Sequence, residues 1–131
     1  MTRFVVDPRA VIELATNQVE VADAHALLAP TLLRSQTLSL LHVAVHRGEV
    51  PADVARNRLA VINQMKIRYL GDAVLRRRAW DLAEQLGRAS TYETEYLALT
   101  QLQGEALVAL DPELSRLAQD VVPLAGIDAL G

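Results

Sequence analysis

The chain has 131 residues, a formal net charge of −3 and no cysteine. This length leaves room for one hydrophobic core, so we expect a single domain over residues 1–131. The lack of cysteine excludes disulfides, thiolate metal sites and a cysteine nucleophile, and the negative charge excludes a general attraction to nucleic acid. With no secretory signal and no apolar run near the roughly 20 residues that span a bilayer, the expected location is cytoplasmic.

The first predicted element is a short strand made by Phe4-Val5-Val6, an apolar run that indicates burial on both faces. Asp7 ends this strand, and Pro8 opens a short helix because proline is pre-shaped for the first helical position. A polar break follows from Asn17 to Asp23. Pro30 is then expected to open the longest amphipathic helix of the chain.

That long helix is predicted to run to about His46 and to end at Gly48, and Pro51 starts another helix through about Gln64. Residues 66–70 are weakly strand-like. The spacing of apolar residues predicts two more helices, Asp72 to Leu86 and Ser90 to Gly104.

The end of the chain repeats the pattern of its beginning. An apolar strand over residues 106–110 is followed by Asp111 and Pro112, which open a short helix to about Ala118. Residues 121–124 are expected to form an edge strand because they contain Pro123. Helices between short strands predict an α/β fold, a three-layer α/β/α sandwich with a mostly parallel sheet of four or five strands.

Three acids are candidate ligands for a metal ion. Asp7 and Asp111 each follow a buried strand, and the carboxyl ends of parallel strands open on one crevice. Glu93 lies in the first turn of the helix before the second of these strands. Carboxylates gathered there repel one another unless a hard cation such as Mg²⁺ or Mn²⁺ neutralises them.

Each acid also has a purely structural interpretation. Asp7 and Asp111 precede proline and are good helix N-caps. Ser90-Thr91-Tyr92-Glu93 matches a capping box, in which the glutamate bonds back to the N–H of the cap. Glu95 is an alternative to Glu93, because apolar residues surround most of its helix and periodicity does not decide which acid points inward.

Several segments carry a resemblance to a known family. In chain order they are Val5-Val6-Asp7, Ala29–Ser35, Arg47-Gly48-Glu49, Ala79–Leu86, Tyr92–Leu99 and Leu107–Asp111. In order and spacing they resemble the PIN-domain ribonucleases, specifically the VapC toxins of bacterial toxin–antitoxin pairs. The resemblance covers nearly the whole chain and implies a PIN-like fold.

The resemblance also implies an activity and a site. It implies a metal-dependent endoribonuclease with Mg²⁺ or Mn²⁺ as cofactor and RNA as substrate, neutralised by a cognate antitoxin and forming a homodimer. Carried over residue by residue, the catalytic residues are Asp7, Gln36, Glu93 and Asp111, of which the three acids hold the metal.

The chain departs from the family pattern at four positions. Gln36 stands where glutamate is expected, Glu93 where aspartate is usual, Ala109 where a hydroxyl residue is common, and Arg9 where a small polar residue is common. An amide oxygen binds Mg²⁺ less well than a carboxylate and is not a base. We therefore expect attenuated activity. The alternative is a catalytically impaired PIN domain that binds RNA or a partner protein.

Other groups of residues point less clearly to function. His42 and His46 have the spacing of a zinc pair but lack a third ligand, so an exposed helix face is expected. Arg76-Arg77-Arg78 is expected to be a solvated face, with a phosphate contact as the second interpretation. By position, Arg9 and Arg34 are the better candidates to touch RNA. A receiver-like signalling domain would need a lysine late in the chain, but the only lysine is Lys66.

Overall fold

The computed structural model describes all 131 residues and contains one sheet of four strands. The strands are β1 (Thr2–Val6), β2 (His25–Pro30), β3 (Ile67–Leu70) and β4 (Ala106–Val108). Their order is β3-β2-β1-β4, and every pair is parallel. The predicted α/β class with a short parallel sheet is therefore confirmed, with four strands.

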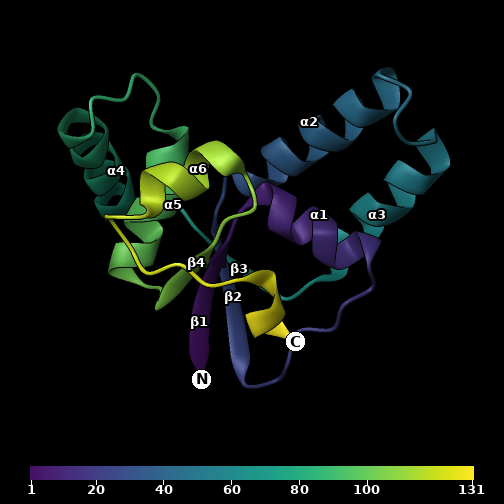
Figure 1. Ribbon diagram of the computed structural model, residues 1–131, viewed down its shortest axis with the longest axis horizontal. Coiled ribbons are helices and arrows are strands. Elements are labelled where there is room, and N and C mark those ends of the chain that lie inside the picture. Colours follow the sequence, from purple (N-terminus) through teal and green to yellow (C-terminus); the bar gives the residue numbers. More distant parts are fainter.

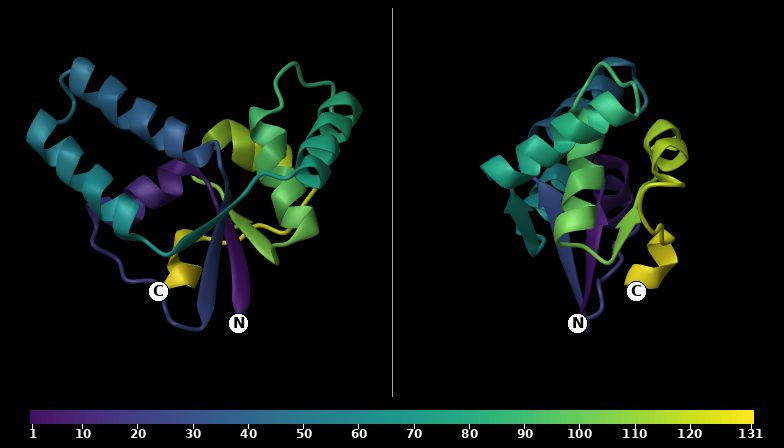
Figure 2. Two further views of the ribbon diagram at one scale, coloured as in Figure 1. Left: turned by 180° about the vertical axis from the view of Figure 1, so that it is seen from behind. Right: turned by 90° about the vertical axis from the view of Figure 1, so that its left-hand side faces the viewer.

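Helices cover both faces of this sheet, as Figure 1 and the reverse view in Figure 2 show. Helices α1 to α3 lie on one side and α4 to α6 on the other, which gives the predicted three layers. The chain ends in a short 3₁₀ helix. The bounds are α1 Pro8–Thr16, α2 Leu33–His46, α3 Ala52–Gln64, α4 Ala73–Gln85, α5 Tyr92–Leu102, α6 Pro112–Ala118 and η1 Ile127–Leu130. None of these helices combines the length and hydrophobicity that a membrane crossing requires.

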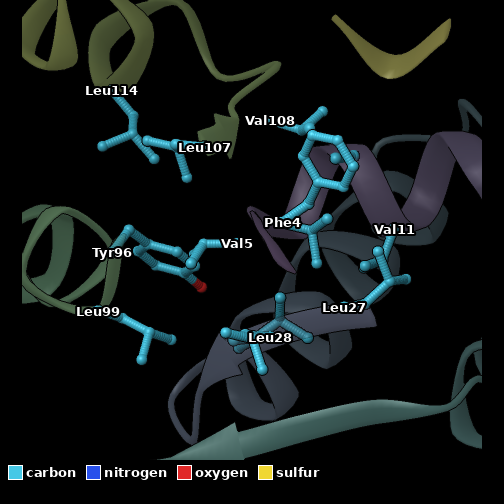
Figure 3. Close-up of a cluster of buried hydrophobic side chains, with 14 of the residues drawn as sticks. Phe4, Val5, Val11, Leu27, Leu28, Tyr96, Leu99, Leu107, Val108 and Leu114 are labelled. Carbon is cyan, nitrogen blue, oxygen red and sulfur yellow. The ribbon is translucent and has the colours of Figure 1, made fainter. Parts of the chain in front are cut away.

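Strand β1 is central in the sheet, and side chains on both of its faces enter the core. Val5 and Val6 have no exposed surface. In Figure 3 Phe4 points toward α1, whereas Val5 points toward Tyr96 of α5. Successive side chains of a strand alternate in this way, so a strand covered by helices on both faces must be apolar throughout. The predicted burial of β1 on both faces is confirmed.

The pairing of β1 with β4 places two predicted acids near each other. Val6 is the register partner of Val108, so both strands end at the same edge of the sheet. Asp7 follows directly, and its backbone N–H donates to the carbonyl of Val108 at 3.2 Å. Asp111 lies three residues beyond the end of β4, at the N-cap of α6. The two acids therefore meet at the carboxyl edge although 104 residues separate them.

The interpretation of Pro30 as a helix start was wrong. Pro30 is the last residue of β2, which pairs with β1 on one side and β3 on the other, and α2 begins only at Leu33. This strand was not predicted from the sequence. Its four central residues are all apolar and carry no alternating pattern, and proline followed by leucines imitates the start of a helix. The strand exists because it pairs with residues far away in the chain.

The end of the sheet is shorter than predicted. Strand β4 stops at Val108, and the edge strand predicted over residues 121–124 is reduced to a single parallel bridge between Leu107 and Leu124. Pro123 has no N–H to donate, but its carbonyl accepts the N–H of Leu107 at 2.9 Å. The segment therefore lies beside β4 without forming a regular ladder.

Candidate functional site

A cleft of about 390 Å³ opens at the carboxyl edge of the sheet. Its walls come from the start of α1, from α2, from the loop before α5 and the first turns of α5, and from the start of α6. All four residues that the family resemblance selects line it: Asp7, Gln36, Glu93 and Asp111. Side chains from four separate segments thus meet in one place.

Asp7 is completely buried at the base of this cleft, and backbone N–H groups hold both of its carboxylate oxygens. Oδ1 accepts the N–H of Ala10 at 2.8 Å, and Oδ2 accepts the N–H of Asp111 at 2.9 Å. Burial raises the pKa of the Asp7 carboxyl above its usual value, and these hydrogen bonds oppose that rise. Asp7 is therefore an N-cap, as its Asp-Pro sequence predicts, and also a residue of the cleft.

Asp111 is partly exposed and is held by one backbone group and one side chain. Its Oδ2 accepts the N–H of Leu114 at 3.0 Å, which caps α6. Its Oδ1 lies 3.4 Å from Nε of Arg9, an exposed residue that lines the same cleft. The sequence-based placement of Arg9 near the acids is thus confirmed.

The capping box predicted for Ser90 and Glu93 is wrong. The N-cap of α5 is Thr91, and Glu93 is turned toward Arg88, whose Nη2 donates to Glu93 Oε1 at 2.8 Å. The same nitrogen of Arg88 contacts Glu113 Oε1. The second oxygen of Glu93, Oε2, is buried without a hydrogen-bond partner. An arginine five residues earlier, in the loop that leads into α5, thus binds Glu93 in place of the backbone N–H that the sequence predicted.

Gln36 is fixed by a tyrosine rather than by a charged group. The hydroxyl of Tyr96 on α5 donates to Gln36 Oε1 on α2 at 2.6 Å. Burial is the main cause that raises the pKa of the Tyr96 phenol, so the hydroxyl keeps its proton and remains a donor. Tyr96 also lines the cleft, three residues after Glu93 and hence on the same face of α5.

Arg88 and Tyr96, which hold Glu93 and Gln36 in place, were not identified by sequence analysis. A signal existed for Tyr96, because positions three apart on a helix share a face and Glu93 was already a candidate. For Arg88 the sequence carries no such signal, since it lies in the loop between α4 and α5. Its partner Glu113 is 25 residues away on α6.

The acids of the cleft are paired with arginines and are not arranged around a common point for a hard cation. In the arrangement seen, no group of three or more His, Cys, Asp or Glu side chains is placed to hold one metal ion. Arg9 pairs with Asp111 and Arg88 pairs with Glu93 instead. The three carboxylates that line the cleft match a divalent cation in number and in charge. In addition, the buried Oε2 of Glu93 has no hydrogen-bond partner and is free to accept one. A cation bound there would therefore compete with Arg9 for Asp111 and with Arg88 for Glu93.

The other candidates lie outside the cleft. Glu95 does not line it; burial raises the pKa of its carboxyl, and the positive charge of Arg76 on α4 opposes that rise. Of the two acids on α5, Glu93 is thus the one at the cleft. His42 and His46 are exposed on α2, as expected. Arg34 does not line the cleft either, since its guanidinium lies 4.2 Å above the ring of Tyr69.

A larger cavity, of about 1000 Å³, lies at the opposite, amino-terminal edge of the sheet. Loop residues 18–23 and the first residues of β2 and β3 line it, together with Lys66. None of the predicted site residues reaches it. Lys66 is therefore separated from Asp7 by the length of the sheet, which contradicts the receiver-like arrangement.

Comparisons with known proteins bear on the fold. No protein-family model and no curated protein matches the chain. Among solved structures, it is similar to the crystal structure of PAE2754 from Pyrobaculum aerophilum, with a TM-score of 0.75 and 20% sequence identity. The match covers 98% of this chain and 92% of that one. At this identity the likeness establishes the fold, and the chain has the PIN-like α/β fold that its sequence resemblance implied.

Proposed function

We propose that this protein is a metal-dependent endoribonuclease, a VapC-type toxin with attenuated activity. The observation that carries the proposal is the convergence of Asp7, Glu93 and Asp111 on one cleft of a PIN-like fold, with Gln36 beside them. RNA is the proposed substrate and Mg²⁺ or Mn²⁺ the proposed cofactor. The cognate antitoxin and the homodimer belong to the same proposal and rest on the family resemblance.

The proposed chemistry divides between the cation and the chain. When bound by the three carboxylates, a divalent cation supplies an activated water and neutralises charge that develops on the phosphate. Asp7 is held rigidly by two backbone N–H groups, so its position needs no rearrangement. Arg9, exposed at the rim, places a guanidinium where it can contact a phosphate of the RNA backbone.

Attenuation follows from Gln36 and Glu93. Gln36 offers an oxygen but no negative charge, and Tyr96 already uses that oxygen. Glu93 reaches the cleft while paired to Arg88, so its charge is partly neutralised. Both features weaken the attraction of the cleft for a cation relative to a set of four carboxylates.

The same two features favour a second candidate function. In this alternative the protein binds RNA or a partner protein without cleaving RNA, because the acids stay paired with Arg9 and Arg88. It differs from the first proposal in one measurable respect, since it predicts RNA binding with no metal-dependent cleavage.

The test is a cleavage assay on structured RNA with Mn²⁺ or Mg²⁺, using the wild type, Glu93→Gln and Asp7→Asn. Each substitution is expected to reduce the rate on the order of 100-fold or more, with circular dichroism showing that the variants remain folded. Glu95→Gln is the matched control, since it makes the same change two residues away and outside the cleft. Equal cleavage by the wild type and Glu93→Gln would assign the activity to a contaminant and overturn the proposal.

A further inference from the structure

We propose that Arg88 is a built-in counter-ion of the acid cleft, which a divalent cation must displace from Glu93, so that Arg88 sets the metal affinity of the site. This inference rests on the proposed metal-dependent function. It gives Arg88 the part of a positioning residue, because it acts through Glu93 and does not line the cleft itself.

The first support is the geometry of the contact. Nη2 of Arg88 lies 2.8 Å from Glu93 Oε1 and also contacts Oε1 of Glu113, so one nitrogen joins acids of α5 and α6. Charge-assisted bonds of this kind are stronger than neutral ones, particularly where water is partly excluded. The Glu93 side chain is only 23% exposed, against 58% for Glu113. The Glu93 side of the bridge therefore gains most from the positive charge.

The second support is that the backbone holds Arg88 in place. The preceding Gly87 has a φ of +66°, which is the left-handed conformation that commonly ends a helix and suits glycine. The N–H of Arg88 then donates to the carbonyl of Ala83 at 2.8 Å, in the last turns of α4. The guanidinium is thus attached to a fixed point beside α5, which makes its pairing with Glu93 a built feature of the fold.

The third support is that the pairing is incomplete. An arginine fork often binds both oxygens of a carboxylate, but here Arg88 binds Glu93 Oε1 alone, and Oε2 is buried without a partner. A buried carboxylate oxygen without a partner is energetically unfavourable. A cation that bound both oxygens of Glu93 would remove this deficit, which gives displacement of Arg88 a physical basis.

Glu113 gives Arg88 a place to remain after displacement. Because Arg88 already contacts Glu113, release of Glu93 leaves the guanidinium paired with a largely exposed acid. Exchange therefore requires a small movement of one partly exposed side chain and no change in the backbone. The competing explanation is a purely structural link, in which Arg88 only joins α5 to α6.

The experiment measures Mn²⁺ affinity by calorimetry, without RNA, together with the urea unfolding midpoint. Arg88→Gln is expected to tighten Mn²⁺ binding roughly three- to tenfold, because partly exposed ion pairs are individually weak. Arg88→Lys keeps the charge but puts it on a shorter side chain with an ammonium in place of the guanidinium, which spans Glu93 and Glu113 less well, so its Mn²⁺ affinity is expected to fall between those of the wild type and Arg88→Gln. Arg77→Gln is the matched control: it removes the same charge from an exposed α4 residue outside the cleft and should change affinity less than about twofold.

The outcomes separate this inference from the proposed function. If the wild type binds Mn²⁺ and neither Arg88 variant binds it more tightly, Arg88 is only a structural link and the inference is overturned, while the metal site stands. If no protein binds Mn²⁺, both proposals fail. Tighter binding by Arg88→Gln but not by Arg77→Gln supports the counter-ion. Should Arg88→Gln not fold, tighter binding by Arg88→Lys supports the inference and unchanged binding overturns it.

Discussion

The two walls of the acid cleft are held in different ways. On one wall, backbone N–H groups bind the carboxylates of Asp7 and Asp111 at the ends of β1 and β4. On the other, long side chains hold the functional groups: Arg88 binds Glu93, and Tyr96 binds Gln36. The first wall is thus part of the fold itself, whereas the second is assembled from side chains that can move.

This difference coincides with the positions where the chain departs from the acid pattern of the PIN-domain ribonucleases that its sequence resembles. The backbone-held wall keeps both aspartates, since an extra methylene would move an oxygen away from N–H groups whose positions the sheet and helices fix. Both altered acid positions, Gln36 and Glu93, lie on the wall held by side chains. There a longer or uncharged group can be accommodated by turning its partner, so the fold tolerates changes that alter the chemistry.

Asp7→Ala tests the comparison between the two walls and is expected to have the largest effect, a loss of stability. The substitution removes the cap of α1 and leaves two N–H groups without an acceptor, the buried one of Ala10 and the partly buried one of Asp111. We expect a loss of about 3 kcal/mol in the free energy of unfolding, measured by urea denaturation at pH 7. Asp111→Ala removes a partly exposed cap and should lose only about 1 kcal/mol. Equal losses would mean that the burial of Asp7 has no special role.

The two walls also differ in how far the sequence predicts them. Asp-Pro after an apolar run is a local signal, and the sequence alone placed Asp7 and Asp111 at N-caps on one edge of the sheet. The other wall depends on two side-chain pairings, one between Tyr96 and Gln36, which are 60 residues apart, and one between Arg88 and Glu93, which are five apart. Although Arg88 is close to Glu93 in the sequence, no pattern indicates that Glu93 will bind it rather than the N–H of Ser90, because the position of Arg88 follows from the packing of α4 and α5.

Strand β2 shows the same limit at the level of the fold. The helix starts at Pro8 and Pro112 were predicted correctly because proline acts locally, but the same rule misplaced Pro30. Its segment forms a strand because β1 and β3 flank it on both sides, and no window of the sequence contains that information. The positions of site residues that follow from a local sequence signal were therefore predictable. The positions that follow from contacts formed only in the folded chain were not.

A second prediction uses Gln36→Glu, which restores a charge to the side-chain wall. We expect Mn²⁺ to bind about tenfold more tightly, because a fourth carboxylate would line the cleft and Tyr96 could still donate to it. Calorimetric titration of both proteins measures the change. Ser39→Asp adds a carboxylate to the same helix and cleft but at a position outside the proposed set, and it should raise affinity less. An equal gain from both variants would show that charge alone matters, without a defined place for residue 36.

A third, smaller effect concerns the bond that holds Gln36. Tyr96→Phe keeps the buried ring and removes only the hydroxyl that donates to Gln36 Oε1. Because Gln36 faces the cleft, its oxygen can bond to water instead, so the expected loss is about 1 kcal/mol. Urea denaturation measures it. A loss as large as that expected for Asp7→Ala would contradict the view that this wall is adjustable.

The smallest expected effect is that of replacing Glu95, and it tests whether this residue lies outside the acid cleft. Burial raises the pKa of the Glu95 carboxyl, so the folded chain holds this proton more tightly than the unfolded chain does. The stability that the protonated group contributes is therefore lost as pH rises through the folded pKa. Relative to the wild type, Glu95→Gln should gain stability between about pH 4 and pH 7, by no more than about 0.5 kcal/mol.

The same variant should leave Mn²⁺ affinity unchanged, because Glu95 lies outside the cleft and near Arg76 of α4. Urea denaturation at several pH values measures the first expectation and calorimetry the second. Weaker Mn²⁺ binding by Glu95→Gln would indicate that the metal site includes Glu95, on a different face of α5 from Glu93. The Arg88 pair would then lie outside the metal site, and the side-chain wall would have to be redrawn around a different acid of α5.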